Sequence, residues 1–169
     1  YHHQSLFVAQ RRERLAGGSA QVSDPLESLA RQLEASPNYR VLRRFVPPSR
    51  YHEGDGSPTA TGVVVDVETT GLDPSRDKII EFCGVPFEFE RESGRILAVR
   101  EAVSYLEDPG RPIPAEVTKL TGITDAMVAG KRIDEAAVGT LLADVGLVIA
   151  HNAAFDRPFV DRRLPASRD

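Results

Sequence analysis

Apolar and polar positions follow the most regular pattern in the second half of the chain. Residues 63–65 are all valine, and they lead into Asp66 and Glu68, which a single valine separates, before a Thr-Thr-Gly turn. An apolar run of this length that ends in turn residues predicts a buried strand. Because strand side chains alternate between the two faces of a sheet, we expect Asp66 and Glu68 to project to the same side.

Further apolar runs predict the partners of this strand. Residues 79–89 and 96–105 predict a second and a third strand, and the turn at 92–95 between them is short enough to make them antiparallel. Residues 147–150 predict another buried strand, preceded by an amphipathic helix over 133–143 and followed by a second helix. The pattern predicts an α/β fold whose mixed sheet has three antiparallel strands plus a parallel strand, flanked by helices.

Shorter signals connect these elements. Residues 115–120 predict a short helix that Gly122 ends, and Thr124 is expected to cap another short turn. Asn152 is the expected N-cap of the last helix. Since an apolar run precedes each acidic motif, we expect the strand at 63–67 to be central, between the strands at 79–89 and 147–150.

The first 60 residues predict a helical extension and a linker. Residues 6–15 could form a short basic helix, and Asp24 followed by proline is a helix start signal. The apolar stripe of this second helix consists of Leu26, Leu29, Ala30 and Leu33. Residues 47–61 are rich in proline, glycine and serine, as linkers are. We therefore divide the chain into an N-terminal helical extension with linker, residues 1–60, and a second domain, residues 61–169.

Residues 39–46 predict either a short strand or an apolar and basic tether. Arg40, Arg43 and Arg44 in this stretch could contact nucleic acid, but such a cluster is more often a solvated face. Both interpretations remain open from the sequence.

Charge and composition limit the classes of function. Residues 1–60 carry eight basic and six acidic residues, whereas residues 61–169 carry 13 and 19. An acidic domain of this size is not typical of proteins that bind duplex DNA by neutralising phosphates, but it is compatible with a site that meets phosphate through metal ions. No apolar stretch is long enough to span a membrane, and Cys83 is the single cysteine, so we expect a cytoplasmic protein without a membrane partner.

Two neighbouring carboxylates at the end of a buried strand resist desolvation and repel each other. A hard divalent cation would relieve this repulsion, whereas two solvated acids before a loop are the simpler interpretation. Asp156 follows the strand at 147–150 by one helical turn, and ligand sites in α/β sheets gather at strand ends. If the two strands are neighbours, Asp66, Glu68 and Asp156 converge, as a two-metal phosphoryl-transfer site requires.

Three blocks of sequence resemble the DEDD 3′–5′ exonucleases, and among them the relatives of the epsilon proofreading subunit of bacterial DNA polymerase. The blocks are Asp-Val-Glu-Thr-Thr-Gly, Leu-Thr-Gly-Ile-Thr and His-Asn-Ala-Ala-Phe-Asp, within residues 61–164. The resemblance implies a ribonuclease-H-like fold and removal of nucleotides from a 3′ end with two Mg²⁺ or Mn²⁺ ions. It favours single-stranded DNA over RNA as the substrate and makes a DNA polymerase a candidate partner.

The resemblance also assigns roles to individual residues. Asp66, Glu68 and Asp156 would be the catalytic metal ligands, and Glu68 would also orient the attacking water. The residues that would bind the terminal nucleotide or shape its pocket are Thr69, Thr70, Gly71, Leu72, Asn152 and Phe155.

The family's third motif supplies a general-base histidine and a fourth aspartate five residues later. Two pairs in the chain have similar spacings, His151 with Asp156 and Tyr51 with Asp55, but the first belongs to the second motif and the second lies in the linker. We therefore expect the catalytic site of this chain to be incomplete. The chain begins with tyrosine, and we expect it to be a fragment that continues past Asp169 in the native protein.

Two other classes of protein compete with this interpretation. A non-catalytic module that binds nucleic acid or a polymerase could retain the same fold. An actin-like or sugar-kinase ATPase also has a first strand that ends in an acid, but its phosphate loop needs glycine where Glu68 stands.

Overall fold

The computed structural model describes residues 24–44 and 46–164 of the chain. The chain divides into two units, residues 48–164 belonging to one and residues 24–47, apart from 45, to the other. In chain order the elements are α1 (Pro25–Glu34), β1 (Thr59–Thr69), β2 (Ile79–Glu90), β3 (Ile96–Val99), β4 (Val103–Leu106), α2 (Ala115–Thr121), α3 (Asp125–Val128), α4 (Glu135–Leu142), β5 (Leu147–Ile149) and α5 (Ala153–Arg163).

The smaller unit contains the predicted helix α1. The Asp24 side chain accepts a hydrogen bond from the Leu26 N–H at 3.0 Å, which confirms the helix start signal. Arg43 donates to Glu27 at 3.0 Å and also pairs with Glu34, so α1 itself satisfies this guanidinium. Residues 39–44 form neither helix nor strand. The tether and the solvated-face interpretations are therefore favoured for this stretch. The helix predicted over residues 6–15 lies outside the described residues.

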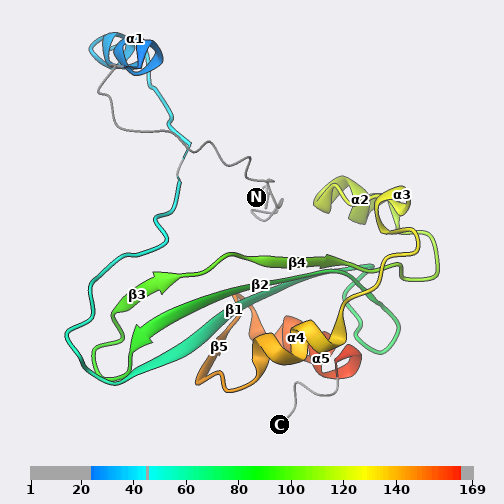
Figure 1. Cartoon of the computed structure of the whole chain (residues 1–169). Helices are drawn as coiled ribbons and strands as arrows, with labels where there is room; N and C mark the ends of the chain where they lie inside the picture. The colour runs from blue at the N-terminus through cyan, green and yellow to red at the C-terminus, as the bar shows by residue number, and fades with distance from the viewer. Residues whose placement is uncertain (1–23, 45, 165–169) are drawn as a thin grey trace. The chain divides into compact units, whose positions relative to one another are not determined.

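The sheet of the larger unit has the order β3-β2-β1-β5, and β4 pairs with another part of β2 (Figure 1). β1 runs antiparallel to β2 over its whole length and parallel to β5 at residues 62–64. The predicted mixed sheet with a central first strand is confirmed. β1 begins at Thr59, so it also includes the end of the stretch that we predicted as linker.

The third predicted strand is wrong in one respect, because the structure divides residues 96–105 between β3 and β4. Residues 100–102 bulge opposite Val85 and Pro86 of β2, where three residues face two. Proline has no N–H to donate to a ladder, and the bulge keeps one bond, from the Arg100 N–H to the Pro86 carbonyl at 2.8 Å. Both strands remain antiparallel to β2.

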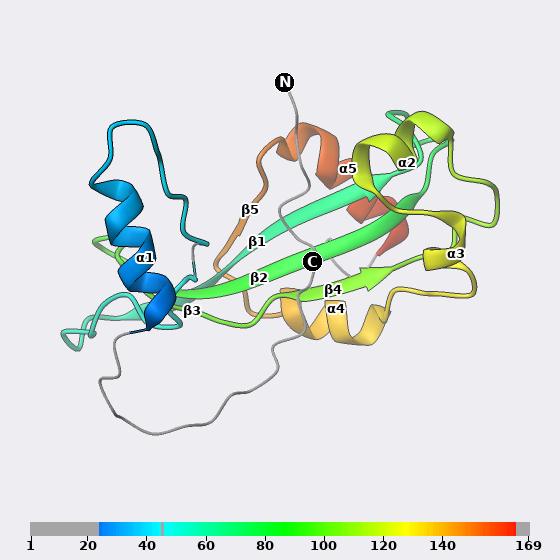
Figure 2. The same ribbon diagram turned by 90° about the horizontal axis from the view of Figure 1, so that it is seen from above.

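The two faces of β1 differ as the sequence pattern predicts. Val63, Val65 and Val67 are buried against residues of α4 and α5, among them Val138 and Phe159. Figures 1 and 2 show both helices on the same side of the sheet. A second buried cluster, formed by Ile80, Ile113, Ile123 and Val128, lies where α2 and α3 meet the start of β2. The apolar residues of β1 thus anchor the strand that carries the acidic motif.

One predicted detail of the last strand is wrong. β5 is not buried, since Leu147, Val148 and Ile149 are 42%, 55% and 41% exposed at the edge of the described sheet. Thr124 and Asn152 occupy the N-cap positions of α3 and α5 as predicted, although neither side chain makes a capping hydrogen bond within the described residues. Asp134 does cap α4, accepting the Ala137 N–H at 2.9 Å. No described helix combines the length and the apolar run needed to cross a membrane.

Gly62 provides a test of how tightly β1 and β2 pack. A Cβ atom at this position would lie 2.2 Å from the ring of buried Phe87, so Gly62→Ala should reduce the free energy of unfolding by about 1–3 kcal/mol. In Gly139→Ala, the matched control in α4, the new Cβ meets nothing within 4 Å, and we expect a gain of about 0.5–1 kcal/mol. Urea denaturation of both variants measures the difference, and equal effects would contradict this packing.

Candidate functional site

The acidic motif lies on the half-buried face of β1. Asp66 and Glu68 alternate with buried valines, so both carboxylates project to the face opposite α4 and α5. In the register with β2, Asp66 lies opposite Cys83 and Glu68 lies opposite Glu81. The predicted placement of the two acids on one side is confirmed.

Asp156 reaches the same strand from α5. β5 pairs with β1 only as far as Val64, so the Val67 N–H lies beyond the end of this ladder. The Asp156 Oδ1 accepts that N–H at 3.2 Å, and the residue is only 5% exposed. Since Val67 separates Asp66 from Glu68, the third carboxylate is attached to the backbone between the other two.

Burial and mutual repulsion raise the pKa values of Glu68 and Asp156. Desolvation is the main cause that raises the pKa of Glu68 to about 7, and the charges of Asp66, Glu81 and Asp156 add to it. Desolvation also raises the pKa of Asp156, with a further contribution from Asp66, although the Val67 N–H acts in the opposite direction. Clustered charges without a counterion are unfavourable, so proteins seldom keep them without a role. Shifted pKa values of this kind are therefore frequent at functional sites.

The chemistry of these donors fits divalent metal ions. Carboxylate oxygens are the ligands that Mg²⁺ and Mn²⁺ prefer, and a cation would relieve the repulsion that raises the pKa of Glu68. As the side chains stand, however, no group of three or more His, Cys, Asp or Glu in the described residues is arranged to hold a metal ion. The acids therefore lie near one another, but their side chains, as they stand, do not form a complete set of metal ligands.

Glu81 belongs to this cluster, and our sequence analysis missed it. Its carboxylate accepts a hydrogen bond from the Ser104 hydroxyl at 2.8 Å, and burial together with Asp66 raises its pKa. An acid among the apolar residues at the start of β2 was the available signal. Only the strand register, which places Glu81 opposite Glu68, could show that it joins the other acids.

The end of β1 and the loop after it contain four of the six residues predicted to bind the terminal nucleotide or shape its pocket. Thr69 and Thr70 are buried, and the Thr69 hydroxyl donates to the Gly71 carbonyl at 2.6 Å. The Thr70 hydroxyl donates to Asp77 at 3.1 Å. Leu72, in contrast, is 82% exposed. Of these side chains, Leu72 is the one that solvent, and hence a ligand, reaches most readily.

The two predicted residues near Asp156 lie in different environments. Asn152 is exposed at the start of α5. Phe155 packs against the main core, with its ring 5.1 Å from that of Phe159. His151, next to Asn152, is close enough that its charge lowers the pKa of Asp156.

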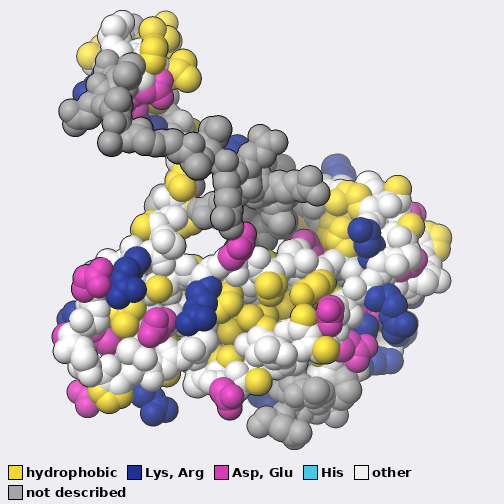
Figure 3. All heavy atoms as spheres, viewed as in Figure 1, with side chains coloured by type: hydrophobic (Ala, Val, Ile, Leu, Met, Phe, Trp, Pro, Cys, Tyr) yellow, Lys and Arg dark blue, Asp and Glu magenta, His cyan; other side chains and the backbone are white. Residues whose placement is uncertain are grey.

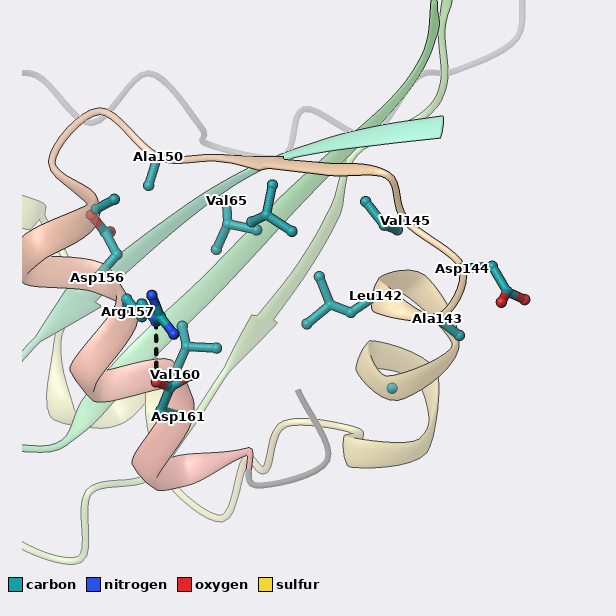
Figure 4. Close-up of a pocket in the computed structure, with 13 residues that line it drawn as sticks. Val65, Leu142, Ala143, Asp144, Val145, Ala150, Asp156, Arg157, Val160 and Asp161 are labelled. Carbon is teal, nitrogen blue, oxygen red and sulfur yellow. Dashed lines mark hydrogen bonds and ion pairs between the residues drawn. The ribbon is translucent and has the colours of Figure 1, made fainter. Parts of the chain in front are cut away.

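A separate hollow of about 990 Å³ opens between β1, β5, α4 and α5 (Figure 4). Asp156 is the one member of the acidic cluster among its lining residues, and Figure 4 shows Val65, Leu142, Val145 and Val160 around it. Because Asp66 and Glu68 project to the opposite face of the sheet, the hollow shares Asp156 with the acidic site but neither of these two acids.

Charged side chains of both signs are interspersed on the face shown in Figure 3, around hydrophobic side chains in its middle. This distribution agrees with the net charge of −4 for the whole chain. A face of this kind does not neutralise a phosphate backbone by itself.

Comparison with known families gives one match that covers most of the larger unit. The model of the RNase_T family, described as an exonuclease, matches residues 63–165. The matched range includes residues 63–69 of β1, with Asp66 and Glu68, and the whole of α5, with Asp156.

Among curated proteins, the chain is 38% identical over 118 residues to a DNA polymerase III PolC-type of Listeria welshimeri, covering 69% of this chain and 8% of that protein. It is 41% identical over 112 residues to a DNA polymerase III subunit epsilon-like protein of Rhodobacter capsulatus, covering 61% of this chain and 14% of the relative. The chain thus spans a small part of the length of these relatives.

Solved structures with the same fold include two examples of exonuclease I. The enzyme from Methylocaldum szegediense has a TM-score of 0.50 and 25% identity, with 62% of this chain and 23% of that chain covered. The E. coli enzyme in complex with a dT13 oligonucleotide has a TM-score of 0.50 and 20% identity, with 64% and 24% covered. These likenesses confirm the predicted ribonuclease-H-like α/β fold.

The raised pKa of Glu68 predicts how stability depends on pH without metal. Between the ordinary value of 4.5 and about 7, the folded state binds more protons than the unfolded state, so this group makes stability fall as pH rises. In buffer with a chelator, Glu68→Gln should therefore stabilise the protein at pH 8 by about 1 kcal/mol after allowance for solvent screening, and change little at pH 4.5.

Glu116 in α2 is exposed, and Glu116→Gln is the control for this comparison. Urea denaturation at the two pH values gives the free energies of unfolding. If Glu68→Gln shows no greater gain at pH 8 than Glu116→Gln, the acids do not repel one another as the structure indicates.

Proposed function

The chain belongs to the RNase_T exonuclease family, and from that premise we propose that its acidic site serves metal-dependent 3′–5′ hydrolysis of single-stranded DNA. The observation that carries the proposal is the bond from the Val67 N–H to Asp156, which attaches a third carboxylate between Asp66 and Glu68. The exonuclease I bound to dT13 and the polymerase III relatives support DNA rather than RNA as the substrate.

Asp66, Glu68 and Asp156 would hold two divalent cations, Mg²⁺ or Mn²⁺. Such a pair supplies the positive charge that activates a water molecule and stabilises the leaving oxygen. Glu68, whose pKa is about 7 without a cation, would become fully ionised and orient the attacking water. The exposed side chain of Leu72 would contact the terminal base or sugar.

The other predicted substrate residues would act through the shape of the site. Thr69, Thr70 and Gly71 would form the floor of the nucleotide pocket, since both threonines are buried and their hydroxyls are engaged within the loop. Asn152 and Phe155 would support the start of α5, near Asp156. A DNA polymerase is the partner that the names of the relatives suggest, and such a partner would place the protein in the cytoplasm.

Metal binding gives the first test of this proposal. Asp66→Asn should abolish measurable Mn²⁺ binding in titration calorimetry, because it removes one of three ligands from the proposed site. The control, Asp55→Asn, alters an exposed acid whose carboxylate accepts the Ser57 N–H, and should bind Mn²⁺ as the unaltered chain does. Equal losses in both variants would place the metal elsewhere.

The polarity of substrate binding gives the second test. With Mn²⁺, the chain should bind a linear oligodeoxynucleotide with a 3′-hydroxyl end at least tenfold more tightly than a circular one of the same sequence. Blocking the 3′ end with phosphate should weaken binding, whereas a 5′ phosphate should not. Equal affinity for linear and circular DNA would contradict recognition of a 3′ end and favour a general nucleic-acid-binding module.

We also propose that residues 1–169 lack the general-base histidine and the fourth aspartate of the family's third motif. Loss of a general base typically lowers a rate by about 10²–10⁴-fold. This chain should therefore remove only traces of mononucleotides from the 3′ end of a 5′-labelled oligonucleotide, seen as shortening of the labelled strand. Glu68→Gln controls for contaminating nuclease. Rapid degradation that Glu68→Gln abolishes would contradict the proposal and assign the base to this chain, with His151 as the first candidate.

A further inference from the structure

The loop between β1 and β2 is built around the carboxylate of Asp77. The Oδ2 atom of Asp77 accepts the Asp73 N–H at 3.0 Å, and its Oδ1 accepts the Thr70 hydroxyl at 3.1 Å. A Cβ atom at Gly71 would lie 2.4 Å from the Asp77 Oδ2, so a residue without a side chain is needed there. These contacts close residues 70–78 into a compact loop, from which Leu72 projects into solvent.

Arg111 joins this loop from a distant part of the chain, the segment between β4 and α2. Its Nη2 donates to the Thr70 Oγ1 and to the Asp77 Oδ1, both at 2.8 Å. The Arg111 side chain is 46% exposed, but that of Asp77 is only 19% exposed. Bonds between ionised groups are stronger than neutral ones, and the partial burial of Asp77 limits solvent screening.

The Thr70 hydroxyl has no capacity left for a substrate. It donates its proton to Asp77, and it accepts both the Lys78 N–H at 3.1 Å and the Arg111 Nη2. A hydroxyl offers one donor and two acceptor lone pairs, so all three are used. Thr70 therefore cannot hold a terminal nucleotide by a hydrogen bond unless this network opens.

We propose that Arg111 is a positioning residue that holds the 70–78 loop in the conformation that presents Leu72 beside the acidic site. The inference rests on the proposed function, since Leu72 matters only if a 3′-terminal nucleotide binds there. Asp73, Thr70 and Asp77 restrain the loop from within, whereas Arg111 ties it to the segment before α2. Arg162 of α5 adds another tie through the Pro74 carbonyl.

Hydrogen exchange in metal-free buffer tests the structural half of this proposal. The Asp73 and Lys78 amides donate to the Asp77 carboxylate and the Thr70 hydroxyl, so their exchange reports opening of the loop. Arg111→Met should accelerate their exchange by about tenfold, the effect of losing a charge-assisted hydrogen bond. Arg111→Lys keeps several donors on one nitrogen and should restore part of the protection.

Arg76→Met is the matched control for charge. Arg76 lies in the same loop, but its side chain is 81% exposed and pairs with Asp73 three residues away. Exposed pairs of this kind contribute little. If Arg76→Met accelerates exchange as much as Arg111→Met does, or if neither variant changes it, Arg111 does not hold the loop.

Binding measurements test the functional half. Arg111→Met should weaken Mn²⁺-dependent binding of a 3′-hydroxyl oligodeoxynucleotide by about tenfold and leave the affinity for Mn²⁺ alone unchanged, since Arg111 touches the loop and not the acids. In an Asp77→Asn background the same substitution should have a smaller effect, because one of the two acceptors of the Arg111 Nη2 has then lost its charge and only the neutral bonds remain.

A loss that is undiminished in the Asp77→Asn background and grows at low salt would overturn the proposal, since it would indicate direct contact between Arg111 and phosphate. A loss of Mn²⁺ affinity in Arg111→Met would overturn it as well. If the unaltered chain binds no oligonucleotide, the proposed function fails, and hydrogen exchange still decides whether Arg111 holds the loop.

Discussion

The hydrogen bond from the Val67 N–H to the Asp156 carboxylate is the contact on which the acidic site depends. β5 is only three residues long and leaves the Val67 N–H without a backbone partner from that strand. A buried amide needs an acceptor, and the Asp156 side chain supplies it. A longer β5 would satisfy Val67 through its own backbone, and α5 would then lose the anchor that brings its carboxylate between Asp66 and Glu68.

The same arrangement brings together acids that repel one another. Desolvation and like charges make the cluster unfavourable without a cation, as the raised pKa of Glu68 shows. The valines of β1, packed against α4 and α5, keep the strand in place despite this repulsion. A cation that binds only the folded state would stabilise that state by mass action. Metal binding and folding should therefore be coupled in this domain.

The sequence predicted best those structural features that depend on a single strand. The valine run and the alternation of acids predicted β1, its central place and the shared face of Asp66 and Glu68, because those features depend on local periodicity. The break between β3 and β4 was not predictable in the same way, since it depends on how residues 100–102 meet Pro86 in the paired strand. The burial of β5 was mispredicted because an apolar run does not reveal whether its strand lies inside a sheet or at its edge.

Glu81 and Arg111 show the limit of such reasoning for the site. Each joins the site only through a partner far away in the sequence: Glu81 through its register with Glu68, and Arg111 through Thr70, 41 residues before it. The Thr70 hydroxyl, assigned by resemblance to the nucleotide pocket, is occupied by this network. Motifs identify the residues, but the long-range contacts determine which of them remain available to a ligand.

A crystal structure with Mn²⁺ and a 3′-terminal nucleotide, analysed by anomalous scattering, would show whether the three carboxylates hold the metal ions. We expect anomalous peaks within about 2–2.5 Å of carboxylate oxygens of Asp66, Glu68 and Asp156, with the nucleotide beside Leu72. Peaks bound by other residues, or a nucleotide in the hollow between β5, α4 and α5 with the three acids free of metal, would contradict this expectation.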